Sequence, residues 1–250
     1  MLFKKSPILV FIIANLFLFF SCQIAKEKKG PILFLVWDNE KFGYIDNTGK
    51  TVINPQFDSA IPFSESLAAV KVGNNWGYID KTGKFVINPQ FDYAWHFLEG
   101  LALVKVGFVG NNWGYIDKTG KFVINPQFDR AGGFSEGLAP VKIENKYGYI
   151  DKTGKLVINP QFDDADPFSE GLAAVKVENK WGYIDKTGKL VINPQFDDVT
   201  IWGFLEGITS VLINERLAYI NKKGNIIWIS STTIPRPVRF VLFFHSRWIY

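Results

Sequence analysis

NKYGYIDKTGKLVINPQFDD (residues 145–164) returns as NKWGYIDKTGKLVINPQFDD (residues 179–198), and the two stretches differ only by Tyr147 in place of Trp181. Near-identity at a spacing of 34 residues indicates a tandem repeat in which each copy is one packing unit. GYID occurs five times, and each copy is followed eleven residues later by the start of NPQFD. A sixth copy, with AYIN at 218–221, lacks NPQFD. The repeat therefore decides the fold.

Each repeat contains three short runs of β-prone residues: in the copy above, 172–177 (LAAVKV), 181–185 (WGYID) and 189–192 (KLVI). The polar ENK between the first two predicts a hairpin. Asp185 to Gly188 predicts a type I turn with Gly188 in the left-handed conformation. We expect the proline of NPQF to end the third strand, because it lacks a backbone donor. The unit is thus a three-stranded antiparallel meander followed by a return loop, FDxAxxFxEG.

Side-chain alternation places Trp181 and Tyr183 on one face of the second strand and Gly182 and Ile184 on the other. The Trp181 position also holds Tyr147, Phe42 and Leu217 in other copies, so we interpret it as requiring volume rather than ring chemistry. The glycine beside it should let a neighbouring strand or ring approach closely. The structural repeat positions are Trp76, Gly77, Trp113, Gly114, Tyr147, Gly148, Trp181 and Gly182.

A lone meander can bury only one face, so neighbouring copies must cover each other. The sequence predicts an all-β fold of stacked three-stranded meanders. An open solenoid-like array and a closed propeller-like ring both satisfy the spacing. We expect this domain over residues 31–229, with five full repeats and a degenerate sixth. Residues 230–250 form either a capping strand or an irregular tail.

These motifs resemble the WG repeat, named for the pairs Trp76-Gly77, Trp113-Gly114 and Trp181-Gly182. The resemblance covers about residues 32–229. It implies a bacterial repeat often found on exported or envelope proteins, and it brings no catalytic residues that can be assigned here.

The N-terminus is typical of an export signal. Lys4 and Lys5 precede an apolar run from Ile8 to Phe20, which is too short to cross a bilayer, and we expect a signal peptide over residues 1–21. Cys22 is the only cysteine and lies where signal peptidase would cut. This boundary resembles that of a bacterial lipoprotein, although Leu18 lies one position too early. It implies lipidation of Cys22, a polar tether over 22–30 and attachment to a membrane of the cell envelope; the alternative is a leftover thiol beside an ordinary cleavage site.

The composition gives no sign of catalysis. Glu65, Glu99 and their repeat equivalents occupy the same environment in every copy, whereas acid/base catalysis needs carboxyl groups with unlike pKa values. No His, Cys or Ser partner repeats at a useful spacing. We therefore expect no enzyme, metal or cofactor, with an envelope-associated hydrolase as a distant alternative. A formal charge of +4 does not indicate a nucleic-acid partner.

Two sets of residues are candidates for recognition. The first is a row of lysines at equivalent turns, which either keeps strand edges soluble or forms a basic edge for anionic glycans, lipid headgroups or acidic proteins. Its members are Lys81, Lys84, Lys118, Lys121, Lys152, Lys155, Lys186 and Lys189. The second set breaks the repeat. It comprises Trp95, His96, Phe108 in the FVG insertion, Gly132-Gly133 and Trp202.

Together these features predict a surface-anchored, non-catalytic binding or scaffold module whose ligand is a protein or an anionic glycan. The alternative is a purely structural spacer of the envelope. Neither the ligand nor the oligomeric state follows from the sequence.

Overall fold

A computed structural model describes residues 31–107 and 112–235 of the chain. These residues form 23 strands joined by turns and loops, and no helix capable of crossing a membrane occurs among them. The predicted signal peptide, Cys22, Phe108 and residues 236–250 lie outside the described residues.

The strands form six antiparallel sheets in which neighbouring strands follow one another in sequence. The first sheet contains β1 (Phe34–Asp38), β2 (Lys41–Ile45) and β3 (Thr51–Phe57). The second contains β4 (Ser59–Ala60), β5 (Ala68–Val72), β6 (Asn75–Ile79) and β7 (Phe85–Phe91). The third contains β8 (Tyr93–Leu98), β9 (Leu101–Lys105), β10 (Trp113–Ile116) and β11 (Phe122–Phe128).

The last three sheets repeat the four-stranded pattern. The fourth contains β12 (Arg130–Ala131), β13 (Leu138–Ile143), β14 (Lys146–Asp151) and β15 (Leu156–Phe162). The fifth contains β16 (Asp164–Ala165), β17 (Ala173–Val177), β18 (Lys180–Ile184) and β19 (Leu190–Phe196). The sixth contains β20 (Asp198–Val199), β21 (Ile208–Ile213), β22 (Arg216–Asn221) and β23 (Ile226–Ile229).

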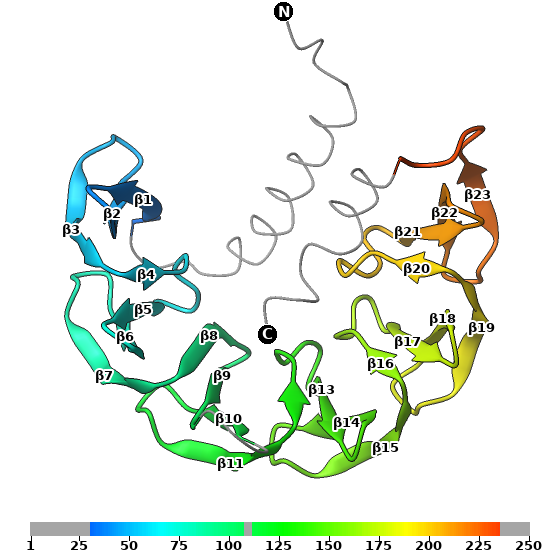
Figure 1. Cartoon of the computed structure of the whole chain (residues 1–250), viewed down its shortest axis with the longest axis horizontal. Coiled ribbons are helices and arrows are strands. Elements are labelled where there is room, and N and C mark those ends of the chain that lie inside the picture. Colours follow the sequence, from blue (N-terminus) through cyan, green and yellow to red (C-terminus); the bar gives the residue numbers. More distant parts are fainter. Residues whose placement is uncertain (1–30, 108–111, 236–250) are drawn as a thin grey trace, which may run out of the picture.

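The sheets stand side by side around an arc, like the blades of an incomplete propeller (Figure 1). The short strands β4, β16 and β20 lie toward the inside of the arc, and the long strands β7, β15 and β19 lie on its outside. The first and last sheets form the two ends and share no strand pairing. The predicted open all-β array is therefore confirmed, and its units are arranged about a common centre as in the ring that we considered as the alternative.

The fourth strand of the later sheets is a departure from the predicted three-stranded unit. The expected meander is present, but part of the return loop pairs with it: Asp164 lies opposite Lys176 and Ala165 opposite Val175. Apart from the six-residue β8 of the third sheet, this strand is only two residues long, so no side-chain alternation marks it in the sequence. Because it directly follows the long outer strand of the preceding sheet, each repeat contributes strands to two sheets.

The turn after the second strand forms as predicted. In the fifth sheet the Asp185 carboxylate accepts hydrogen bonds from the Thr187 backbone N–H at 2.9 Å and its hydroxyl at 2.6 Å. Gly188 donates to the Asp185 carbonyl at 2.9 Å and has a φ of 86°. A Cβ at Gly188 would lie 3.1 Å from Ile158 of the fourth sheet, so the turn also packs on the neighbouring unit.

The prediction that proline ends the third strand is wrong. The strand β19 continues through Pro194 to Phe196, and its register with β18 shifts between Trp181 and Tyr183. The proline lies in this bulge, where the ladder needs no donor from it. A Cβ on Gly182 would meet the Ile192 carbonyl oxygen at 2.5 Å. The glycine of each WG pair therefore admits the bulged strand, as its position predicted.

The two faces of a sheet are covered by its two neighbours. In the fifth sheet, Trp181 and Tyr183 belong to a buried cluster with Val211 of the sixth sheet. Ile184, on the opposite face, belongs to a cluster with Tyr149 of the fourth sheet. Burial of apolar surface between units is therefore the main force that holds the array together.

The sixth sheet shows what changes when the motif degrades. Ala218 replaces the glycine and pairs with Ile229, so the bulge that lies opposite the glycine in the fifth sheet is absent, while a register shift remains between Tyr219 and Ile220. Residues after β23 stay beside this sheet: Ser230 donates to the Leu217 carbonyl and Ile234 to the Glu215 carbonyl, each at 2.8 Å. The first part of the predicted tail thus extends along the end of the array.

Candidate functional site

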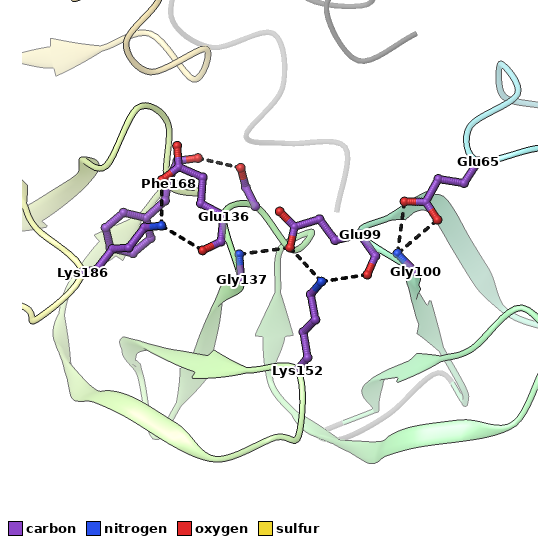
Figure 2. A network of polar contacts seen from close by, with 9 residues as sticks. Glu65, Glu99, Gly100, Glu136, Gly137, Lys152, Phe168 and Lys186 are labelled. Carbon is purple, nitrogen blue, oxygen red and sulfur yellow. Dashed lines mark hydrogen bonds and ion pairs between the residues drawn. The ribbon is translucent and has the colours of Figure 1, made fainter. Parts of the chain in front are cut away.

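The repeated glutamates connect adjacent sheets. Glu136 follows β12 in the fourth sheet with a φ of 54°, and its carboxylate accepts the backbone N–H of Gly171 in the fifth sheet at 3.0 Å. The Lys186 ammonium, also in the fifth sheet, lies 3.1 Å from this carboxylate and donates to the Glu136 carbonyl at 3.0 Å. We call this arrangement the Glu–Gly–Lys bridge, and Figure 2 shows the equivalent bridge formed by Glu99, Gly137 and Lys152.

The bridge recurs at four successive junctions, at carboxylate–ammonium distances of 2.9–3.1 Å. Its members are Glu65, Gly100 and Lys118; Glu99, Gly137 and Lys152; Glu136, Gly171 and Lys186; and Glu170, Gly207 and Lys222. Burial alone would raise the pKa of Glu170, but hydrogen bonds from Lys222 and Gly207 outweigh it and hold the pKa below its ordinary value. Each of the four glutamates therefore caps the following sheet by accepting a glycine N–H and pairing with a lysine.

The candidate basic edge is divided by these bridges. Lys118, Lys152 and Lys186 are paired with glutamates, so much of their charge is compensated. Lys81 lies at the equivalent turn of the second sheet. Lys84, Lys121, Lys155 and Lys189 are at the other end of the turns and are exposed. Lys222 belongs to the same set, but the repeat motif did not predict it, because KKGN replaces the usual turn in the sixth copy.

Trp95 and His96 are packing residues in this structure. The Trp95 ring stacks on Tyr93 at 6.1 Å, and Trp95 packs against the buried cluster between the third and fourth sheets. His96 is hydrogen-bonded to the Pro62 backbone, and burial lowers its pKa to about 4 despite the opposing effect of this bond. Trp202 is half-buried in the loop before β21. Trp95 and His96 therefore contribute to contacts within the chain.

A pocket of about 290 Å³ lies between the fourth and fifth sheets, and we call it the Tyr147 pocket. Its apolar lining comprises Ala131, Gly132, Gly133, Pro140, Ala165, Pro167 and Ile201. Its polar lining comprises Arg130, Lys142, Tyr147, Asp163, Asp164 and Asp166. It thus combines both signs of charge with proline and glycine surfaces.

Charges around Tyr147 are already partly compensated. Burial and the nearby Asp164 raise the pKa of Tyr147 to about 12, while a hydrogen bond with Arg130 has the opposite effect. The Lys142 ammonium lies 5.8 Å from the Tyr147 ring centre, and Lys146 forms an ion pair with Asp163 at 2.5 Å. The hydroxyl of Tyr147 is therefore a neutral donor and acceptor at ordinary pH. Here the ring position has a polar role that volume alone did not predict.

The pocket coincides with departures from the repeat. Arg130 replaces Ser59 or Tyr93 of other sheets, and Pro140 replaces Ala69. The repeat pattern marked Gly132-Gly133 and Tyr147, but it gave no connection between them and these two residues. An alignment of the copies would have shown that all these departures fall in the same repeat. It would not have shown that the residues line one cavity.

Each of the two glycines accommodates a particular neighbour. A Cβ at Gly132 would lie 2.8 Å from Pro140, and one at Gly133 would lie 2.6 Å from Leu98 of the third sheet. Among the described residues, no group of three or more His, Cys, Asp or Glu side chains is arranged to hold a metal ion.

The model of the WG containing repeat matches five segments: 42–76, 76–107, 113–147, 147–181 and 181–216. The chain belongs to the WG-repeat family. No curated protein matches the sequence.

Solved structures with a similar fold are only distantly related in sequence. BamB from Moraxella catarrhalis has a TM-score of 0.52 at 12% identity, with 83% of this chain and 72% of that chain covered. Kluyveromyces lactis Hsv2 has a TM-score of 0.51 at 10% identity, covering 82% and 81%. Kluyvelomyces marxianus Hsv2 has a TM-score of 0.50 at 12% identity, with 83% of this chain and 84% of that chain covered. These WG-repeat sheets thus share a propeller-like fold with proteins of other families.

Proposed function

We propose that this WG-repeat protein is an exported, membrane-anchored binding module without catalytic activity. The observation that carries the proposal is the use of the repeated charges: four glutamates and their lysines hold adjacent sheets together. What remains for recognition is the surface where the copies differ, and several such differences meet at the Tyr147 pocket. Binding residues in repeat proteins characteristically vary over a constant scaffold.

The repeated aspartates support a structural role in the same way. The pKa values of the carboxyl groups of Asp80, Asp117 and Asp185 are lowered, chiefly by a hydrogen bond from the side chain of the threonine two residues later. Identical environments give identical ionisation, whereas a catalytic pair needs one group that holds a proton and one that does not. These carboxylates therefore serve as turn formers.

Binding is tested by screening the full chain, purified in detergent, on a glycan array and by pull-down from envelope extracts. The screen is repeated with the Arg130→Ser and Trp202→Ala variants. Lys121→Ser, which changes an exposed turn residue, is the control. We expect a ligand whose capture fails with the variants and persists with the control. Absence of any ligand in both screens would favour the structural spacer.

Membrane anchoring is proposed through Cys22, at the end of the apolar N-terminal run. A triacyl anchor buries enough methylene groups, at about 0.8 kcal/mol each, to retain the chain at a membrane. Expression in bacteria with labelled palmitate should label the wild-type chain and leave Cys22→Ser unlabelled. Equal labelling of the two would remove Cys22 as the site, and no labelling of either would contradict lipidation.

A further inference from the structure

We propose that the Tyr147 pocket binds a neutral, polyhydroxylated ligand of about the size of one sugar unit. This inference rests on the binding role proposed above and specifies its site and ligand class. Three features of the pocket support it. They are the loss of aromatic side chains that the third sheet has at this place, the balance of charge, and the size and polarity of the lining.

The first feature emerges when the fourth sheet is compared with the third. At the equivalent place in the third sheet, Tyr93 stacks on Trp95 at 6.1 Å and meets Trp113 edge-on at 5.5 Å. In the fourth sheet the residues in the positions of Tyr93 and Trp95 are Arg130 and Gly132. The pocket therefore occupies a place that aromatic side chains fill one sheet earlier.

The second feature is the mixture of charges. The lining brings Arg130 and Lys142 together with Asp163, Asp164 and Asp166. An anionic ligand would face the carboxylates and a cationic ligand would face the guanidinium and ammonium groups. Because Asp163 is paired with Lys146 and the Arg130 guanidinium is hydrogen-bonded to Tyr147, a zwitterion would have to displace existing contacts. Hydroxyl groups, which both donate and accept, can add to these contacts without disrupting them.

The third feature is size and surface. A volume of about 290 Å³ lies just below the range of about 300–1,000 Å³ found for small-molecule sites, so the pocket suits only a small ligand. Pro140, Pro167 and Ile201 offer apolar contact, while Tyr147 and the buried Asp166 contribute polar groups at fixed positions. A sugar ring has this combination of apolar C–H faces and hydroxyl edges. A single ring, rather than an extended polymer, is therefore the unit that we expect in the pocket.

Two variants test the site. Gly132→Ile with Pro140→Ala recreates the second sheet, where Ile61 donates to the Ala69 carbonyl at 3.1 Å just as Gly132 donates to the Pro140 carbonyl at 2.9 Å. The second sheet carries this pair, so the double variant should fold while its new side chain fills the pocket. Arg130→Ser removes one donor and introduces the residue of the second sheet. Lys121→Ser, at an exposed turn, is the control for loss of one positive charge.

Binding to the full chain in detergent is measured by saturation-transfer NMR and calorimetry. The probes are glucose, galactose and N-acetylglucosamine, compared with galacturonic acid and the zwitterion glycylglycine. We expect a neutral sugar to bind, with affinity falling at least tenfold in both pocket variants and changing less than twofold in Lys121→Ser. Thermal unfolding of each variant verifies that it is folded.

The other outcomes overturn the inference in distinguishable ways. Preference for galacturonic acid or glycylglycine would contradict the ligand class. Sugar binding that survives both pocket variants would contradict the site but leave the proposed binding function in place. No binding by any probe would contradict the inference, while the array and pull-down screens decide the proposed function separately.

Discussion

At the residue scale, the glycine of each WG pair is what permits the bulge opposite it. A Cβ at this position would lie only 2.4–2.7 Å from the isoleucine carbonyl oxygen and the proline nitrogen of the opposite strand, so its absence leaves room for that backbone. The sixth sheet has an alanine at this position and pairs without that bulge. The requirement for glycine therefore comes from close backbone approach.

Gly182→Ala should consequently lower the free energy of unfolding by about 1–3 kcal/mol, the usual cost of forcing extra atoms into a packed site. Ala218→Gly is the matched control and should change it by about 1 kcal/mol or less, the usual cost of glycine within a strand. Urea denaturation measures both. Equal effects of the two substitutions would show that the close approach at Gly182 does not limit stability.

His96 should make stability depend on pH. Its pKa is about 4 in the folded chain and 6.5 in the reference state, so the folded protein resists protonation. The neutral imidazole of His96 makes its full contribution to the free energy of unfolding above about pH 6.5, and this contribution is lost as the pH falls from 6.5 toward 4. The shift corresponds to about 3 kcal/mol. Urea denaturation between pH 4 and 7 should show this loss, and His96→Gln should reduce it by at least half; an unchanged pH profile would contradict the assignment.

At the scale of elements, the Glu–Gly–Lys bridge connects side chains that are far apart in the sequence. Its glutamate and glycine are 35–38 residues apart, and the lysine lies 50–53 residues beyond the glutamate carbonyl it contacts. The same motif ends in the sixth sheet, where Glu206 has the left-handed backbone but no further sheet follows among the described residues. This gives an internal comparison between bridged and terminal copies.

Glu136→Ala should lower the free energy of unfolding by about 1–2 kcal/mol, because it leaves the Gly171 N–H without its carboxylate and removes a partly exposed ion pair. Glu206→Ala places alanine in the same left-handed backbone conformation but removes no bridge to a following sheet. Its effect on the free energy of unfolding should therefore be smaller by about 1 kcal/mol. The difference is measured by urea denaturation. If both variants are equally stable, the bridge contributes nothing to the array.

The sequence predicted those elements that depend on local patterns. Alternation around Trp181 predicted the two faces, and the Asp185 turn followed from Asp and Gly at fixed positions. The two-residue β16 and the strand continuing through Pro194 escaped prediction, because both depend on pairing with a second strand. The Tyr147 pocket escaped for a similar reason: Arg130 and Pro140 are ordinary residues until the fold brings them to one place.

At the scale of the whole molecule, stability should come from interfaces between sheets. Each interior sheet packs one face on the preceding sheet and the other on the following one, as the clusters around Ile184 and Trp181 show. An array of this kind gains stability with each added unit, because each unit adds one more interface. Independent units would each unfold at the same denaturant concentration.

The most direct test is urea denaturation of chains that end at residues 163, 197 and 235, which retain four, five and six sheets respectively. Mutual covering predicts that the free energy of unfolding and the midpoint both rise from the shortest chain to the longest. The same midpoint in all three chains, with only the signal amplitude changing, would contradict the account.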